Sequence, residues 1–138
     1  MKCVFCDIAR GDASAHVIYE DDRLLAFLDA RPLFPGHVLL IPREHYGTLP
    51  ELPAGLVQPL FSTAQRLCSA VTSAMRAEGS FVAVNNVVSQ SVPHLHIHVV
   101  PRRKGDGLKG FFWPRSKYSS EDHARETAQA IRSAMVPG

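Results

Sequence analysis

The sequence of 138 residues lacks the features of a membrane-spanning, exported or nucleic-acid-binding protein. No apolar run approaches the roughly 20 residues that a helix needs to cross a bilayer. Residues 1–7 contain no long apolar stretch ahead of their first charges, so no signal peptide is expected. The net charge of +2 is too small to indicate nucleic acid as an obligate partner. We therefore expect a protein that binds neither a membrane nor nucleic acid.

Cysteine is scarce as well. Three cysteines cannot all pair with one another, and without an export signal they predict a reducing, cytoplasmic location. Hydrophobic residues make up 46% and charged residues 20%, which is the composition of a globular chain rather than a disordered one. At this length we expect a single domain over residues 1–138, with its core at about 3–103 and a tail and helix over 104–138.

Apolar patterning predicts an α+β domain with a five-stranded antiparallel sheet, one long helix and a C-terminal helix. The β-rich runs follow one another as hairpins, with the long helix inserted between them, rather than as βαβ units. Residues 4–11 are expected to form a short apolar turn. We expect strands over residues 16–20, 24–28, 37–41, 81–84 and 92–100, the long helix over 51–78 with Pro59 in its first turn and Gly79 as its end, and a last helix capped by Ser119 or Ser120.

The strongest signal is the run of residues 94–100, in which His94, His96 and His98 alternate with apolar residues. Alternate side chains of a strand point to one face, so three imidazoles would lie in a row, roughly 6.5–7 Å apart, with the apolar residues facing the core. Three interpretations are open: a polar strand face in water, a metal site, or nucleophilic catalysis by a largely neutral imidazole.

The neighbours of this run favour catalysis on a phosphate. Gln90 and Ser91 precede it at a turn, and Asn85 and Asn86 follow the preceding strand. Amide and hydroxyl donors suit a phosphate and its leaving group. A metal site would favour nearby carboxylates or thiolates, and residues 79–105 contain no Asp or Glu.

The run 94–100 resembles the histidine-triad (HIT) family, in which His and apolar residues alternate in this way. Residues 5–8, 20–29 and 35–45 resemble the same family, so that the resemblance covers about residues 3–103. It implies a HIT-like fold and a homodimer whose two sheets join across a two-fold axis. It also implies a nucleotide hydrolase or nucleotidyl transferase that acts on an adenylyl or similar group.

The implied reaction cleaves nucleoside phosphoramidates or dinucleoside polyphosphates at the α-phosphate, through a covalent nucleotidyl-histidine intermediate and with no metal required for catalysis. Two alternatives remain. One is a nucleotide-binding module without catalytic activity, and the other is a metal-dependent hydrolase that uses the histidines as ligands.

The resemblance also assigns roles to individual residues. His96 resembles the nucleophile, with its other ring nitrogen held by a main-chain carbonyl, and His98 resembles the residue that bonds the phosphate oxygens. His94 and His37 resemble outer members that orient the site or relay protons. The residues that resemble contacts to an AMP-like or GMP-like substrate are Ser91 and Gln90 for the phosphate or leaving group, Asn85 for the phosphate or ribose, Asp29 for the ribose hydroxyls, and Phe5, Ile8 and Phe27 for the walls of the base pocket.

The chain departs from the family pattern in two places before its triad. Many relatives have a glycine-rich turn ahead of the glutamine, whereas residues 87–89 here are Val, Val and Ser. Pro93 removes one backbone N–H group directly before the first histidine. Residues 104–118 have no assigned role, and within them residues 111–114 are expected to form an apolar anchor.

Cys3 and Cys6 form a C-x-x-C pair, which is half of a zinc site and needs two further ligands. Some members of the family carry a structural zinc ion bound by two Cys and two His, and His45 and His94 match those positions. The resemblance therefore implies a structural Zn²⁺ held by these four residues. Two buried thiols without a metal are the alternative, and Cys68 is expected to pack within the long helix.

Overall fold

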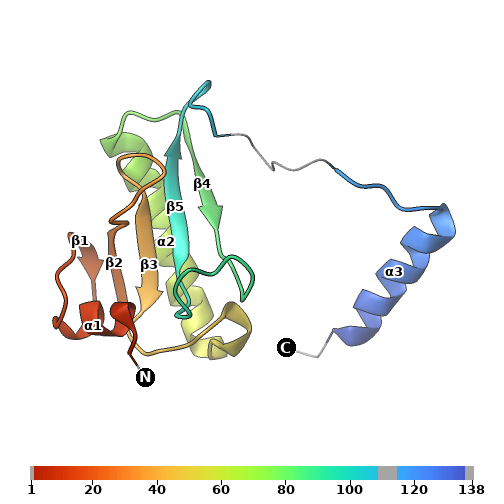
Figure 1. Ribbon diagram of the computed structural model, residues 1–138, viewed down its shortest axis with the longest axis horizontal. Coiled ribbons are helices and arrows are strands. Elements are labelled where there is room, and N and C mark those ends of the chain that lie inside the picture. Colours follow the sequence, from red (N-terminus) through yellow and green to blue (C-terminus); the bar gives the residue numbers. More distant parts are fainter. Residues whose placement is uncertain (1, 109–114, 136–138) are drawn as a thin grey trace. The chain divides into compact units, whose positions relative to one another are not determined.

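The computed structural model describes residues 2–108 and 115–135, which group into two compact units (Figure 1). One unit comprises residues 1–106 and contains the whole sheet, and the other comprises residues 107–138. The apolar anchor predicted at residues 111–114 lies outside the described residues.

The larger unit is built on a five-stranded sheet in which every neighbouring pair is antiparallel. The strand order is β1-β2-β3-β5-β4, which places β1 and β4 at the two edges. This confirms the predicted α+β class. The strands are β1 (Val17–Glu20), β2 (Leu24–Leu28), β3 (Val38–Pro42), β4 (Gly79–Ala83) and β5 (Ile97–Arg102).

The central strands are buried on both faces, because each face packs against a helix. On one face, Leu24 and Ala26 of β2 join the core beneath α2 (Ala54–Ala74). On the other face, Leu25 and Phe27 of the same strand pack with Phe5 of α1 (Val4–Arg10). The period-2 alternation of a strand therefore divides one continuous apolar run between two cores.

The long helix differs from its predicted bounds at both ends. Residues Leu49–Glu51 form a separate 3-10 turn, and α2 begins only after Pro53. The prediction placed Pro59 in the first turn of this helix, but Pro59 lies beyond the first turn of α2. Because proline has no backbone N–H, the helix lacks one backbone hydrogen bond there. The helix ends at Ala74, and Arg76 then takes a φ of 52°. Gly79 begins β4 instead of ending the helix.

The predicted fifth strand is also shorter than expected. β5 begins at Ile97, so that His94 and His96 precede the strand and only His98 belongs to it. Leu95, Ile97 and Val99 are fully buried, as the alternation predicts. Within residues 4–11, predicted as a turn, Val4–Arg10 form the helix α1, and Gly11 follows it in the left-handed conformation.

The smaller unit contains α3 (Glu121–Ala134), whose start agrees with the predicted serine cap. The hydroxyl oxygen of Ser120 accepts a hydrogen bond from the backbone N–H of His123 at 3.0 Å. No residue of α3 is buried. Among the described residues, no helix combines the length and the apolar character needed to cross a bilayer.

Candidate active site

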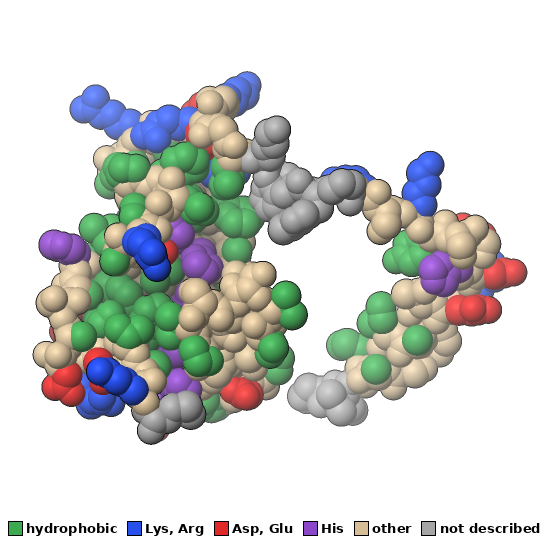
Figure 2. Space-filling model, in the orientation of Figure 1, with side chains coloured by type: hydrophobic (Ala, Val, Ile, Leu, Met, Phe, Trp, Pro, Cys, Tyr) green, Lys and Arg blue, Asp and Glu red, His purple; other side chains and the backbone are tan. Residues whose placement is uncertain are grey.

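A pocket of about 930 Å³ lies beside α1 and the ends of β2 and β5. Its walls are mainly apolar side chains, and in Figure 2 hydrophobic groups cover this face with histidines at their border. Phe5 lines this pocket, with its ring centroid 5.4 Å from that of Phe27 and 5.1 Å from that of His96. An apolar slot that ends at imidazoles is suited to a flat base joined to a phosphate.

The seven predicted site residues that line this pocket come from four separate segments of the chain. Gln90 and Asn85 do not line it, and His37 and His94 lie behind its wall, where both are buried. The pocket also contains His16 and Arg31, which the sequence did not single out, since both are isolated polar residues in loops. The predicted residues in the lining are Phe5, Ile8, Phe27, Asp29, Ser91, His96 and His98.

His96 is buried, and one of its ring nitrogens is engaged by the main chain. Its Nδ1 lies 2.7 Å from the carbonyl oxygen of His94. A carbonyl oxygen only accepts, so Nδ1 carries the proton and the neutral ring keeps a lone pair on Nε2. Because His96 lines the pocket, this lone pair makes its Nε2 a candidate nucleophile.

His98 and His37 form a hydrogen-bonded pair. The Nε2 of His37 lies 2.9 Å from the Nδ1 of His98, and it lies 3.6 Å from a carboxylate oxygen of Asp29. The other nitrogen of His37 accepts the backbone N–H of Leu33 at 3.0 Å. His37 therefore donates through Nε2, and His98 keeps its own proton on Nε2.

Burial keeps this histidine pair neutral. The pKa of His98 is lowered to about 4, chiefly by desolvation and to a smaller extent by the neighbouring rings of His96 and His37, against the opposing charge of Asp29. Burial likewise lowers the pKa of His37, although the charge of Asp29 opposes that shift. A neutral imidazole can donate a hydrogen bond to a phosphate oxygen without carrying a charge of its own.

The loop before the triad is held by its own side chains. The side-chain oxygen of Gln90 accepts the backbone N–H of Val87 at 3.1 Å, and its amide donates to the carbonyl of Gly47 at 2.6 Å. Asn85 donates to the carbonyl of Ser89 at 3.2 Å. These contacts give Gln90 and Asn85 a role in shaping the loop that leads to Ser91.

This loop has an unusual backbone where the family pattern has glycine. Val87 has a φ of 70° and Ser89 a φ of 62°, in the left-handed region that costs a side chain with a Cβ about 1–2 kcal/mol. Val87 and Val88 are also 75% and 78% exposed. The loop thus reaches a conformation suited to glycine without containing one.

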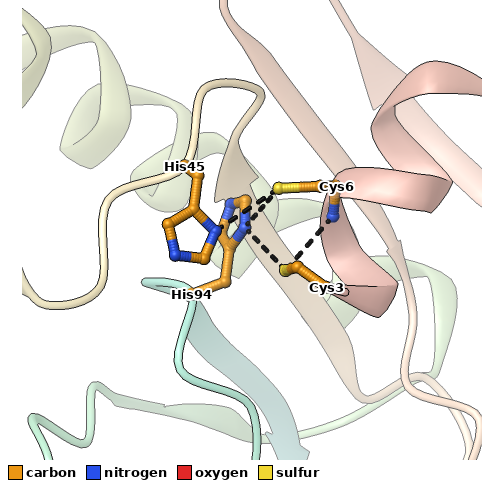
Figure 3. A group of neighbouring side chains, drawn as sticks. All are labelled: Cys3, Cys6, His45 and His94. Carbon is orange, nitrogen blue, oxygen red and sulfur yellow. Dashed lines mark hydrogen bonds between the residues drawn. The ribbon is translucent and has the colours of Figure 1, made fainter. Parts of the chain in front are cut away.

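A second cluster, which we call the Cys/His tetrad, consists of Cys3, Cys6, His45 and His94 (Figure 3). The two cysteines come from the start of α1, and the histidines come from the loops that follow β3 and precede β5. One potential ligand atom from each residue lies within 4.8 Å of the others. The Nδ1 of His94 is 3.4 Å from the sulfur of Cys3 and 3.6 Å from that of Cys6.

The chemistry of the tetrad fits a zinc ion. Two sulfurs and two imidazole nitrogens form a donor set that zinc prefers in tetrahedral structural sites. The Nε2 of His94 lies 2.9 Å from the carbonyl oxygen of Pro42, so it donates there and leaves Nδ1 unprotonated toward the sulfurs. Burial raises the pKa of Cys6, and bound zinc would reverse that preference by holding the thiolate.

Comparison with protein families identifies residues 10–105 as a match to the family described as HIT domain. The adenylylsulfatase HINT3 of Arabidopsis thaliana is 40% identical over 108 residues, which cover 77% of this chain and 55% of the plant protein. The chain thus spans about half the length of that relative. An uncharacterized HIT-like protein of Mycobacterium tuberculosis is 39% identical, over 99% of this chain and 94% of its own.

A yeast relative carries a named activity. The adenosine 5'-monophosphoramidase hnt1 of Schizosaccharomyces pombe is 33% identical, over 88% of this chain and 90% of its own. Among solved structures, a HIT family protein of Bacillus subtilis has a TM-score of 0.90 at 28% identity and covers all of both chains. A zinc-bound histidine triad protein of Mycobacterium smegmatis has a TM-score of 0.74 at 38% identity, over 98% of this chain and 99% of its own.

Proposed function

Because the chain belongs to the HIT domain family, we propose that it is a nucleotidyl hydrolase or transferase acting at the α-phosphate of nucleoside phosphoramidates or dinucleoside polyphosphates. The observation that carries this proposal is the buried His96, whose Nδ1 is held by a carbonyl while its Nε2 lone pair is available to the pocket. The named activities of the two relatives, the plant adenylylsulfatase and the yeast adenosine 5'-monophosphoramidase, support a substrate that contains an adenylyl group.

The proposed reaction has two steps. The Nε2 of His96 attacks the α-phosphorus, a nitrogen–phosphorus bond forms, and the leaving group departs with the electron pair of its bond to phosphorus. Water then attacks the same phosphorus, the nitrogen–phosphorus bond breaks, and a proton is released with the nucleotide product. Holding His96 in attack geometry contributes up to about 7–11 kcal/mol in the best intramolecular models.

The pocket supports an AMP-like or GMP-like substrate. Phe5, Phe27 and Ile8 would enclose the flat base, and the carboxylate of Asp29 would accept the ribose hydroxyls. Ser91 and His98 would donate to the phosphate oxygens, where a well-placed donor contributes about 3 kcal/mol to transition-state stabilisation. His37 and His94 would orient the two reacting histidines from behind the wall.

We propose that Zn²⁺ binds the Cys/His tetrad and that catalysis itself needs no metal. When bound, zinc would supply a structural crosslink between α1 and the loops that carry His45 and His94. The zinc-bound mycobacterial structure supports this ion for the tetrad. His96 and His98 are not members of the tetrad, which keeps the proposed nucleophile free of the metal.

We also propose a homodimer in the cytoplasm. β4 is an edge strand of the sheet, and its Val82 is 41% exposed, so the side of the sheet at β4 is the proposed place for a second copy to join. The three cysteines, all free, suit a reducing compartment.

The test is to incubate the full-length protein with adenosine 5'-phosphoramidate or diadenosine polyphosphate in metal-free buffer and to search for a nucleotidylated His96 by mass spectrometry. We expect an adduct on His96 and turnover that His96→Ala abolishes. His123→Ala is the matched control, because His123 belongs to α3 of the smaller unit, whereas all the pocket-lining residues belong to the larger one. Nucleotide binding without turnover would indicate a binding module, and turnover lost on chelation from a protein that stays folded would indicate a metal-dependent hydrolase.

A further inference from the structure

We propose that the backbone amide of Leu33 is a positioning group for the phosphate site: it fixes the tautomer of His37 and, through His37, holds His98 as a neutral donor with its proton on Nε2. The inference rests on the proposed function only for the ligand, a phosphate oxygen of the nucleotide. The tautomers themselves follow from contacts within the chain.

The amide of Leu33 and the rings of His37 and His98 are linked by two hydrogen bonds, and only one arrangement of protons satisfies both. A backbone N–H can only donate, so the Nδ1 of His37 must accept from Leu33 and the proton of His37 lies on Nε2. That proton is directed at the Nδ1 of His98, 2.9 Å away, which must therefore be an acceptor. The remaining nitrogen of His98 carries its proton, and the side chain of His98 lines the pocket.

A second proton has no place in this arrangement. Protonation of His98 at Nδ1 would direct two N–H groups at each other across 2.9 Å. Reversing the bond would require a proton on the Nδ1 of His37, which already faces the N–H of Leu33 at 3.0 Å. Since an unmade hydrogen bond is costly in a buried site, the pair stays neutral.

The electrostatic surroundings act in the same direction. The titratable groups that face His98 are His96 from its own segment, His37 directly before β3, and Asp29 directly after β2. Of these, only Asp29 favours the protonated ring, and burial outweighs it. The pKa of His98, about 4, therefore agrees with the geometry.

The contribution of Leu33 comes from its main chain, because its side chain is 53% exposed. The loop that presents this amide is closed by two backbone hydrogen bonds: Asp29 N–H donates to the carbonyl of His37 at 2.9 Å, and His37 N–H donates to that of Phe34 at 3.0 Å. The amide is thus held on the histidine by a short, closed loop.

One mechanistic consequence is that His98 stabilises charge on the phosphate but does not supply the proton that the leaving group takes up. An acid that protonates a leaving group must have a proton to lose near the working pH. His98 has only its Nε2–H, and removal of that proton would leave an imidazole anion.

The experiment uses full-length protein labelled with ¹⁵N and long-range proton–nitrogen NMR of the histidine rings, recorded without nucleotide from about pH 5 to 8. We expect His98 to show a neutral ring with its proton on Nε2 throughout this range. Leu33→Pro removes the amide hydrogen and Leu33→Ala retains it. The proline variant should show mixed tautomers on both rings, whereas the alanine variant should show the wild-type tautomer.

The same pair of variants separates positioning from general structural damage. We expect kcat of the proline variant to be about tenfold below that of the alanine variant, with a smaller change in KM, because a misdirected donor weakens transition-state stabilisation. A charged His98 at pH 6 or a proton on its Nδ1 in the wild-type protein would overturn the proposal, as would identical tautomers in the two variants. If the proline variant does not fold, the wild-type spectrum alone decides. Absence of turnover in the wild type would refute the proposed function and leave this inference standing.

Discussion

The main chain of His94 holds the ring of His96. The carbonyl oxygen of His94 lies 2.7 Å from the Nδ1 of His96, while the side chain of His94 points away into the Cys/His tetrad. One residue therefore contributes a carbonyl to the proposed nucleophile and a ring nitrogen to the proposed metal site. The two sites are joined through a single backbone position.

Metal removal is expected to destabilise the protein. The tetrad would crosslink α1, which at seven residues is too short to be stable alone, to the loops of His45 and His94. We expect chelation, or Cys6→Ser, to remove zinc from the protein and to lower Tm by about 3–8 °C, the shift for a loss of 1–2 kcal/mol. Elemental analysis and calorimetry measure the two effects.

The matched control for that prediction is Cys68→Ser. Cys68 lies on α2 and does not belong to the tetrad. This variant should keep its zinc content and its response to chelation. A melting temperature of the wild type that does not change on metal removal would contradict a structural role for the ion.

Stability should fall as the pH falls from neutral. Burial lowers the pKa of His98 to about 4, below the value of about 6.5 in an unfolded chain. Between these values the unfolded state binds the additional proton, so the free energy of unfolding is retained above pH 6.5 and is lost progressively toward pH 4. Urea denaturation at several pH values between 7 and 5 should show a steeper decline for the wild type than for His98→Gln. Equal slopes would argue against the lowered pKa.

Asp29→Asn should reduce selection for ribose. The carboxylate lies in the pocket beside the histidine pair, and a hydrogen bond to a charged acceptor contributes about 1.5–3 kcal/mol. We expect kcat/KM for a ribonucleoside phosphoramidate to fall about ten- to hundredfold, whereas that for the 2',3'-dideoxy substrate changes little. Asp22→Asn, at an exposed turn, is the control. An equal loss for both sugars would refute the assigned contact.

Replacing Val87 by glycine should be tolerated better than the same change at Val88. The two side chains are similarly exposed, but only Val87 has a positive φ. Relief of left-handed strain, about 1–2 kcal/mol, should offset the conformational entropy that glycine adds to the unfolded chain. Val88→Gly gains no such relief and should lower the free energy of unfolding by about 0.5–1 kcal/mol. Urea titration of both variants compares them directly, and equal losses would show that the loop is not strained.

Hydrophobic patterning predicted the sheet well, because it depends on local sequence. β2 has its predicted bounds, and β1 and β3 differ by a residue at one or both ends. The helix α1 was missed because seven residues offer too short a window for helical periodicity. β5 was predicted to begin too early because the alternation of side chains continues through residues 94–96. The backbone there does not pair with a neighbouring strand of the sheet, since Leu95 N–H donates to the carbonyl of Tyr46 at 2.7 Å.

The candidate site was only partly accessible from sequence. The histidine run and the C-x-x-C pair are short, contiguous motifs, and each can be recognised in the sequence without knowledge of the fold. The contact between His37 and His98 joins residues 61 positions apart, so it depends on the pairing of β3 with β5. Gln90 and Asn85 are polar residues at the expected place, yet their side chains bond to the loop instead of lining the pocket. No local pattern distinguishes those two outcomes.

The late start of β5 has a consequence for any redesign of this segment. A ladder that continued back to residue 94 would engage the carbonyl of His94 with a neighbouring strand and leave the ring of His96 without its anchor. Pro93, which cannot donate to such a ladder, stands directly before that carbonyl. The interruption thus keeps the Nδ1 of His96 hydrogen-bonded to a carbonyl, and a more regular sheet here would remove the contact on which the proposed nucleophile depends.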